Sequence, residues 1–301
     1  MQSILVEHIA KKFGDQIAVD DVSFAVESGE IFGLLGPNGA GKTTTIRIIL
    51  DIFKPDAGKV VVLGGAMNEE KKERVGYLPE DRGLYQDIPL ERCLVYLATL
   101  KGLSESEAHQ RIGTYLERFD LAEHKRKKVK ELSKGMQQKA QLISTLVHRP
   151  ELVIIDEPFS GLDPVNTPMV KDLLLEERNR GVTIVMSTHQ MHQVEELCDR
   201  LVLIHQGKVL LYGTLMDVRN SYASQAVLVG CHGLLPDNIA GTQGRQKING
   251  VTKLMLSPGA SPQDVLRSLV SQDIQVEQFE IAVPTLDEIF IKVVQGTGEV
   301  G

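Results

Sequence analysis

The sequence lacks the features that mark secreted, metal-bound or membrane-spanning chains. Its three cysteines, Cys93, Cys198 and Cys231, are far apart and form no C-x-x-C pair. They are interpreted as reduced, packed thiols rather than as a disulfide framework or a metal site. No stretch approaches the roughly 18 consecutive apolar residues of a membrane span. The first residues, MQSILVEHIAKKF, lack the long apolar core of a signal peptide, so we expect a cytoplasmic protein.

Positive charge is also in short supply. The chain has 33 basic and 40 acidic residues, and its formal net charge of -7 argues against a nucleic-acid-binding protein. Basic residues gather at 125–130 (KRKKVK), but one short run of this kind is typical of a solvated helix end. At 301 residues the chain is long enough for one large domain and a smaller one.

One segment of the sequence carries a specific chemical motif. The apolar run Ile31 to Leu35 is followed by a glycine-rich loop. Its residues are Gly36, Pro37, Asn38, Gly39, Ala40, Gly41, Lys42, Thr43 and Thr44. They fit the phosphate-binding pattern G-x-x-x-x-G-K-[ST] at every specified position. An ordinary glycine-rich turn is the simpler interpretation, but four specified positions match by chance in a chain of this length only on the order of 1% of the time.

Each residue type in this loop has a chemical reason. Glycines at 36, 39 and 41 let the main chain curl so that several N–H groups converge on a triphosphate. Lys42 supplies a mobile positive charge for the β and γ phosphates, and Thr43 supplies a hydroxyl for Mg²⁺. The helix that begins near Lys42 directs the positive end of its dipole at the anion.

A phosphate loop needs a carboxylate partner, and the segment Leu152 to Glu157 (LVIIDE) provides one. Four apolar residues predict a strand buried on both faces, and its carboxyl end delivers Asp156 to the Mg²⁺ shell. Glu157 is placed to polarise a water molecule against the γ phosphate. Alone, such a run is more typical of a strand that ends in a solvated turn. Its pairing with the phosphate loop favours the functional interpretation.

The remaining pattern predicts an α/β domain with a parallel central sheet, preceded by antiparallel strands in the segment Ser3 to Val26. Helical periodicity fills residues 89–148, which we interpret as a mostly helical insert. Phe13 lies on the first connection. A single aromatic residue there more often belongs to the core, although it could also offer a face on which an adenine ring stacks.

The remaining elements are predicted from runs of β-branched residues and from helical periodicity. In the large domain, beyond the phosphate loop, strands are predicted at 59–63, 75–78, 152–155, 183–186, 200–204 and 209–212, and helices at 43–52, 168–180 and 191–198. Around Asp217 the pattern resets. Strands at 225–231, 251–256 and 276–283 and helices at 262–271 and 285–294 predict a separate α+β unit. We therefore expect domains at 1–216 and 217–301.

Three further segments carry a family resemblance. Leu132 to Gln138 (LSKGMQQ) resembles the signature sequence of ATP-binding cassette (ABC) ATPases, a family of P-loop NTPases. Ser160 to Asp163 (SGLD) resembles the D-loop of that family, and Ser187-Thr188-His189 resembles its switch histidine. Together with the phosphate loop and the carboxylate strand, five ordered motifs coincide between Phe13 and about Gly213.

The resemblance implies ATP and Mg²⁺ as cofactors and a site shared by two subunits. In this family Ser133, Gly135 and Asp163 would complete the nucleotide pocket of a partner subunit, and His189 would contact the γ phosphate beside Glu157. Phe13 would be a contact of the nucleotide base. Taken alone, Ser133 is a natural N-cap and would indicate no more than an ordinary capped helix.

Two departures from the family pattern matter. The signature has Lys134 and Met136 where the family more often has Gly and Gln, and Glu80 stands where the Q-loop glutamine is usual. The carboxylate of Glu80 can still bind Mg²⁺ or a water molecule. These variants, together with the segment Pro284 to Phe290 (PTLDEIF), resemble the bacterial and archaeal branch that powers drug, sodium and similar exporters.

The resemblance implies an ATP-hydrolysing subunit that energises a separate integral-membrane permease for export of a drug, an ion or a similar substrate. It would act as a dimer, peripherally on the inner face of the cell membrane, without a nucleic-acid partner. One alternative is an ABC ATPase that acts mechanically in DNA repair or translation. Another is a non-catalytic nucleotide sensor, although Lys42, Asp156 and Glu157 are all present.

Overall fold

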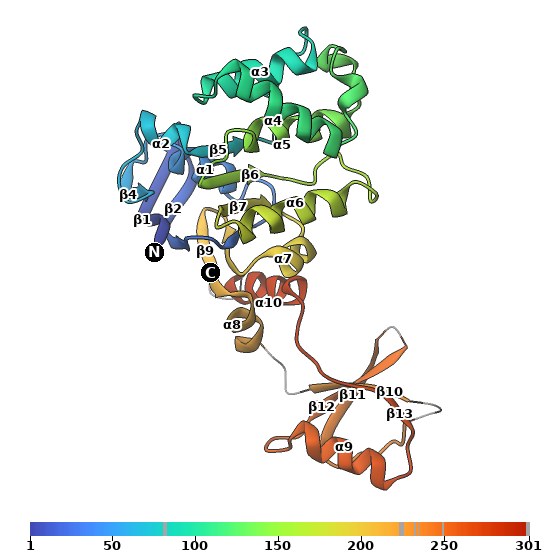
Figure 1. Ribbon diagram of the computed structural model, residues 1–301. Coiled ribbons are helices and arrows are strands. Elements are labelled where there is room, and N and C mark those ends of the chain that lie inside the picture. Colours follow the sequence, from blue (N-terminus) through green and yellow to red (C-terminus); the bar gives the residue numbers. More distant parts are fainter. Residues whose placement is uncertain (81–82, 223–225, 232, 234, 249, 299–301) are drawn as a thin grey trace. The chain divides into compact units, whose positions relative to one another are not determined.

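The computed structural model describes residues 1–80, 83–222, 226–231, 233, 235–248 and 250–298. The chain folds as two compact units, Met1–Leu215 and Met216–Gly301 (Figure 1). Each unit has a hydrophobic core of its own, built in the first unit around residues such as Phe32 and Ile154 and in the second around Val227 and Leu254. In the described part of the chain, no helix is both long enough and apolar enough to span a bilayer.

An antiparallel sheet opens the first unit. It contains β1 (Gln2–Phe13), β2 (Gln16–Glu27) and β4 (Ala57–Val62) in the order β2-β1-β4. The antiparallel subdomain predicted from the sequence is therefore confirmed. The expectation that Phe13 belongs to the core is wrong, because the residue is 45% exposed. Its ring packs edge to face with Phe53, with ring centroids 5.5 Å apart, and Nζ of Lys11 lies 5.8 Å from its centroid.

The second sheet of this unit positions the chemistry. Its strands are β3 (Ile31–Leu35), β5 (Val75–Leu78), β6 (Leu152–Asp156), β7 (Thr183–Thr188), β8 (Arg200–His205) and β9 (Lys208–Thr214). They lie in the order β5-β6-β7-β3-β8-β9, and all neighbours are parallel except the β8–β9 hairpin. Every residue of β3, β6 and β7 is buried, which explains their continuous apolar runs. The predicted α/β class is confirmed.

Helices flank this sheet. They are α1 (Lys42–Ile49), α2 (Glu69–Glu73), α6 (Thr167–Asn179) and α7 (Met191–Leu197). The first of these was expected to reach Ile52. It ends at Ile49 because Asp51 adopts a left-handed conformation with φ of +60°, which an α-helix cannot continue through.

The helical insert forms a lobe of its own, drawn in green in Figure 1. It contains α3 (Leu90–Leu100), α4 (Glu105–Arg118), two short 3₁₀ turns at Ala122–His124 and Val129–Glu131, and α5 (Lys134–Leu146). Side chains of Ser104 and Ser133 accept hydrogen bonds from the first turns of α4 and α5, so each helix begins at a side-chain cap. The mostly helical insert predicted for residues 89–148 is confirmed.

The second unit is a small α+β fold. Its sheet contains β10 (Ala226–Cys231), β11 (Thr242–Ile248), β12 (Val251–Leu256) and β13 (Val276–Ile281) in the antiparallel order β11-β12-β10-β13. The helices of this unit are α8 (Leu215–Ser221), whose first residue closes the first unit, α9 (Pro262–Ser271) and α10 (Leu286–Gly298). Strand β11 was not predicted, because its sequence TQGRQKI has no alternating apolar pattern. Gln225, where the first predicted strand begins, lies outside the described residues.

Candidate functional site

The register of the parallel sheet brings the motifs to one edge. Leu35, the last residue of β3, pairs with Thr188 at the end of β7, and Ser187 pairs with Asp156 at the end of β6. The loop that follows β3, the carboxylates that follow β6 and His189 after β7 therefore leave the sheet on the same side. This is the carboxyl edge, where ligands bind in open α/β sheets.

Close packing makes glycine necessary in the phosphate loop. Gly36 has φ of +149°, and a Cβ atom there would lie 2.1 Å from the carbonyl oxygen of Ile204. Gly41 has φ of +107°, and its Cβ would lie 2.4 Å from the carbonyl oxygen of Ala18. The loop is thus held between β2 and the end of β8, which fixes its curvature before any ligand arrives.

Lys42 crosses the interior of this loop. Its Nζ donates hydrogen bonds to the carbonyl oxygens of Gly36 (2.7 Å) and Pro37 (3.1 Å), and only 7% of the residue is exposed. Burial lowers the pKa of Lys42, while the carboxylates of Glu157, Asp156 and Glu80 act in the opposite direction. The ammonium group is therefore a desolvated cation at the centre of the loop, and an arriving phosphate would be a strong partner for it.

Thr43 and Asp156 are in direct contact. The Thr43 hydroxyl donates a hydrogen bond of 2.9 Å to Oδ2 of Asp156, and the Ser187 hydroxyl donates to Oδ1. Asp156 is almost completely buried, so these donors compensate for the water that its carboxylate loses. A hydroxyl and a carboxylate side by side form the kind of partial oxygen shell that Mg²⁺ uses next to phosphate.

Glu157 has an unusual backbone. Its φ is +55°, in the left-handed region, and its N–H donates to the carbonyl oxygen of Ser187 at 3.0 Å. The side chain is directed to the start of the next loop, where Oε1 accepts from the backbone N–H of His189 at 3.1 Å and lies 2.7 Å from Nδ1 of the same residue. Glu157 and His189 therefore form one pair beside the phosphate loop.

Glu80 follows β5, the edge strand next to β6, and its side chain is exposed. Its charge acts on Lys42, so this carboxylate lies on the same side of the sheet as the phosphate loop. Residues 81 and 82 of the loop that contains Glu80 lie outside the described part of the chain.

Three predicted residues do not join the cluster. The Ser133 hydroxyl accepts from the N–H of Met136 at 3.3 Å and caps α5. The carboxylate of Asp163 accepts from two N–H groups of its own turn, those of Val165 and Asn166, each at 2.9 Å. A Cβ on Gly135 would lie 3.4 Å from the carbonyl oxygen of Gly161, so the signature and the D-loop adjoin each other. Among the described residues, no hydrogen bond joins these three to the phosphate loop.

Ser187 is the contact that sequence reasoning missed. The segment Ser187 to His189 was selected only for its histidine, yet the serine hydroxyl holds Asp156 in place. The available signal was a small polar residue at the carboxyl end of a buried parallel strand, where a side chain points toward the ligand edge.

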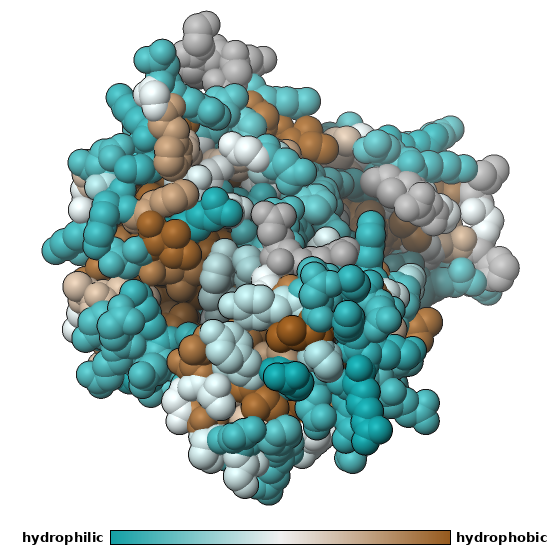
Figure 2. All heavy atoms as spheres, turned by 90° about the horizontal axis from the view of Figure 1, so that it is seen from above, coloured by the Kyte–Doolittle hydropathy of each residue, from teal (hydrophilic) through white to brown (hydrophobic). Residues whose placement is uncertain are grey.

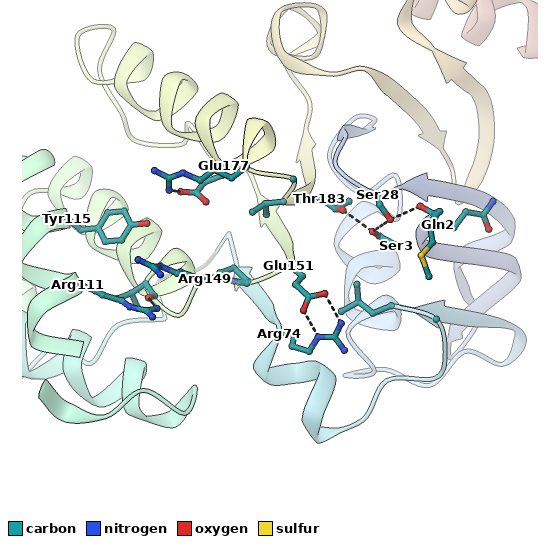
Figure 3. A pocket seen from close by; sticks show the side chains of 18 of the residues that line it. Gln2, Ser3, Ser28, Arg74, Arg111, Tyr115, Arg149, Glu151, Glu177 and Thr183 are labelled. Carbon is teal, nitrogen blue, oxygen red and sulfur yellow. Dashed lines mark hydrogen bonds and ion pairs between the residues drawn. The ribbon is translucent and has the colours of Figure 1, made fainter. Parts of the chain in front are cut away.

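A separate hollow of about 850 Å³ lies at the opposite edge of the parallel sheet (Figure 3). Glu151 and Thr183, at the amino ends of β6 and β7, line it. Polar groups in its wall pair with one another: Arg74 donates two hydrogen bonds to Glu151, at 2.8 and 2.7 Å, and the hydroxyls of Ser3 and Thr183 lie 2.8 Å apart. None of the motif residues line this hollow, so it is not the nucleotide site.

Comparison with known proteins agrees with the geometry of the site. The ABC transporter family matches residues 19–160, and a domain described as "ATP-binding protein DrrA1-3-like, C-terminal domain" matches residues 213–294. The ABC transporter ATP-binding protein YhaQ of Bacillus subtilis (strain 168) is 40% identical over 292 residues, which cover 96% of this chain and 97% of the relative. This chain belongs to the ABC transporter ATP-binding proteins.

Two further relatives support this assignment. The linearmycin resistance ATP-binding protein LnrL of Bacillus subtilis (strain 168) is 30% identical, with 95% of this chain and 96% of the relative covered. A solved structure of an ATP-binding subunit of an ABC transporter superposes with a TM-score of 0.68 and 34% identity, covering 73% of this chain and 92% of that chain. The chain is thus an ATP-binding ABC protein, of the family that hydrolyses ATP to power transport.

Proposed function

We propose that this ABC protein is the ATP-hydrolysing subunit of an exporter and acts as a dimer on a separate integral-membrane permease. The observation that carries the proposal is the meeting of Lys42, Thr43, Asp156 and Glu157 at the carboxyl edge of one sheet. Each of these groups has a partner consistent with its role. Together they supply a positive charge that can bind phosphate, oxygen ligands for a divalent metal ion and a carboxylate that can bind a water molecule.

The residues present fit a nucleotide with Mg²⁺. Thr43 and Asp156 would hold the ion, and the exposed carboxylate of Glu80 is a further candidate oxygen ligand. When bound, Mg²⁺ would neutralise charge on the phosphates. Glu157 orients or deprotonates the attacking water molecule, His189 directs that carboxylate, and Lys42 neutralises the phosphoryl oxygens. Phe13, half-exposed on β1, offers a ring face to the base.

A second subunit is part of the proposal, because among the described residues no hydrogen bond joins the signature residues to the phosphate loop of their own chain. Ser133 and Gly135 stand at the start of α5, whose free N–H groups form an anion site. Asp163 lies on the neighbouring D-loop. We infer that these residues close the nucleotide site of a partner copy, so that two ATP molecules lie between two chains.

The permease would dock on the helical insert and on the loop that contains Glu80. Tyr85, in the segment between Glu80 and α3, and Tyr96 and Leu100 of α3 are exposed apolar residues. The rings of Tyr85 and Tyr96 meet edge to face, with centroids 5.7 Å apart. Figure 2 looks down on the molecule from above the insert and shows apolar patches within a mainly hydrophilic surface. Docking there would hold the protein at the inner face of the cell membrane.

Export is the direction that the relatives favour. LnrL is named for linearmycin resistance, and the domain matched at residues 213–294 is named after DrrA-like ATP-binding proteins. Both similarities include the second unit, and resistance is commonly conferred by removing a compound from the cell. The alternative function in DNA repair or translation has no specific observation in its favour, and the negative net charge opposes binding to nucleic acid.

Two measurements test this proposal. Glu157→Gln keeps the shape of the side chain but removes its negative charge, so ATP turnover should be nearly abolished while ATP-bound dimers accumulate. Affinity purification from membranes should recover a multispanning protein with the chain. If Glu157→Gln turned over ATP as fast as the wild type, Glu157 would not be the catalytic base. If the affinity purification consistently recovered ribosomes or DNA-repair proteins, it would support the alternative function.

A further inference from the structure

Gln138 joins the signature helix to the loop that carries Glu157. Its Nε2 donates a hydrogen bond of 3.1 Å to the carbonyl oxygen of Pro158, and only 8% of the residue is exposed. The orientation of the side-chain amide is fixed, because a carbonyl oxygen accepts and only the NH₂ group can donate. The contact therefore links helix α5 of the insert to the residue that follows Glu157.

The backbone next to the Gln138 contact is strained at Glu157. Glu157 has φ of +55°, a conformation that costs a non-glycine residue on the order of 1–3 kcal/mol and persists only where surrounding contacts hold it. Two backbone bonds do so: the Glu157 N–H donates to Ser187 at 3.0 Å, and the Ser160 N–H donates to the Glu157 carbonyl oxygen at 3.2 Å. Gln138 supplies the side-chain contact on the next peptide.

We propose that Gln138 is a positioning residue for hydrolysis: it holds the Glu157–Pro158 segment in its strained conformation and so keeps the Glu157 carboxylate directed at its water molecule. Because Gln138 lies one turn after Ser133 and Gly135, it also transmits the position of the signature helix to the carboxylate of its own chain. This second role rests on the proposed dimer, since a partner's nucleotide would be what engages the signature.

The neighbouring glutamine has a different role. Gln137 is also buried, but its Nε2 donates to the carbonyl oxygens of Val129 (3.1 Å) and Leu132 (3.0 Å), both within the insert. It stabilises the entry to α5 and makes no bond to the carboxylate loop. Of these two adjacent amides, only Gln138 donates to the segment that follows Glu157, at the carbonyl oxygen of Pro158.

The test compares Gln138→Met with Ser144→Ala in the full chain. Methionine keeps the length and volume of the side chain and removes the donor, while Ser144 is a partly buried residue of the same helix whose hydroxyl bonds only to the Gln141 carbonyl of its own helix. Gln138→Met should lower kcat on the order of tenfold, because small displacements of a catalytic group are costly. The KM for ATP and ATP binding should stay within about twofold, since the phosphate loop is untouched. Ser144→Ala should match the wild type.

A double variant separates positioning from a structural effect. In the Glu157→Gln background, Gln138→Met should change the residual rate by less than about twofold, because the residue acts through Glu157. Unchanged kcat in an active, folded Gln138→Met protein, or a full additive loss in the double variant, would overturn the proposal. Failure of the proposed function is distinguishable, since the wild type itself would then show no ATP turnover.

Discussion

The Thr43 hydroxyl donates a hydrogen bond of 2.9 Å to the carboxylate of Asp156, which lies 113 residues further along the chain. This contact joins the phosphate loop to the carboxylate strand and brings the two candidate Mg²⁺ ligands together. A third strand completes it, because Ser187 on β7 donates to the other oxygen of Asp156. The two proposed Mg²⁺ ligands are thus held next to each other by hydrogen bonds that the protein itself supplies.

Thr43→Val should raise the Mg²⁺ requirement of ATP hydrolysis. The substitution keeps the volume of the side chain and removes the oxygen that faces Asp156, so we expect the Mg²⁺ concentration for half-maximal rate to rise about tenfold or more. Thr45→Val is the matched control on the same helix, because the Thr45 hydroxyl bonds only to the carbonyl oxygen of Gly41. An equal shift in both variants would argue against Thr43 as a ligand.

Lys42→Ala should weaken ATP binding about 10- to 100-fold, because a hydrogen-bonded contact with a charged group typically contributes about 1.5–3 kcal/mol. Equilibrium binding of a fluorescent ATP analogue measures the change. Lys54→Ala removes an exposed lysine that pairs with Asp51 outside the loop and should leave the affinity unchanged. Undiminished affinity in Lys42→Ala would contradict the role of the loop as the phosphate site.

Gly41→Ala should destabilise the fold more than Gly39→Ala. Both glycines have positive φ, +107° and +78°, so each alanine costs about 1–2 kcal/mol of unfolding free energy in backbone strain. Only the Cβ at position 41 also collides with a carbonyl oxygen, that of Ala18 at 2.4 Å, whereas no atom lies within 4 Å of the Cβ at 39. Thermal unfolding of the two variants measures the difference, and equal losses would show that the collision is relieved.

The unfolding free energy of the protein should fall as the pH decreases from about 6.5 to about 4, because His148 stays neutral in the folded chain over this range. Burial, together with the charge of Lys101, lowers the pKa of His148 from 6.5 to about 4. Below pH 6.5 the unfolded chain therefore binds a proton that the folded chain does not accept until about pH 4. The unfolding free energy should drop over this interval by about 3 kcal/mol.

Chemical denaturation across that pH range checks this expectation with His148→Asn. The variant should lack this component of the pH dependence, whereas His192→Asn, at an exposed position, should retain it. If the unfolding free energy of His148→Asn depended on pH in the same way as that of the wild type, other groups would be responsible for the loss of stability in acid.

The sequence predicts the elements of this site better than its contacts. The apolar runs that became β3 and β6 are long enough to specify buried strands, and the motifs after them predict the chemistry at their ends. The contacts of Ser187 and Gln138 could not be found in this way, although the position of Ser187 at the end of a buried strand was a signal for a polar residue near the site. Their roles depend on which strand lies beside β6 and on how the insert packs against the carboxylate loop, which are long-range relations without a local pattern.

The errors have equally physical causes. Strand β11 lies at the edge of its sheet and pairs only with β12, so backbone hydrogen bonds rather than an apolar face specify it. Phe13 was expected in the core on the general behaviour of single aromatic residues, but it ends β1 and remains 45% exposed beside Phe53 and Lys11. Because Phe13 is exposed, the core interpretation is wrong, and its contact with the base of a nucleotide stays a prediction.

The central claim is that two chains build each ATP site. The most direct test is the ATPase rate per chain, measured as the concentration of purified protein is raised through its dimerisation range at saturating ATP and Mg²⁺. The rate per chain should increase with concentration and then level off, because Ser133 and Gly135 must come from a second copy. A rate per chain that is constant down to concentrations at which the protein is monomeric would contradict the claim.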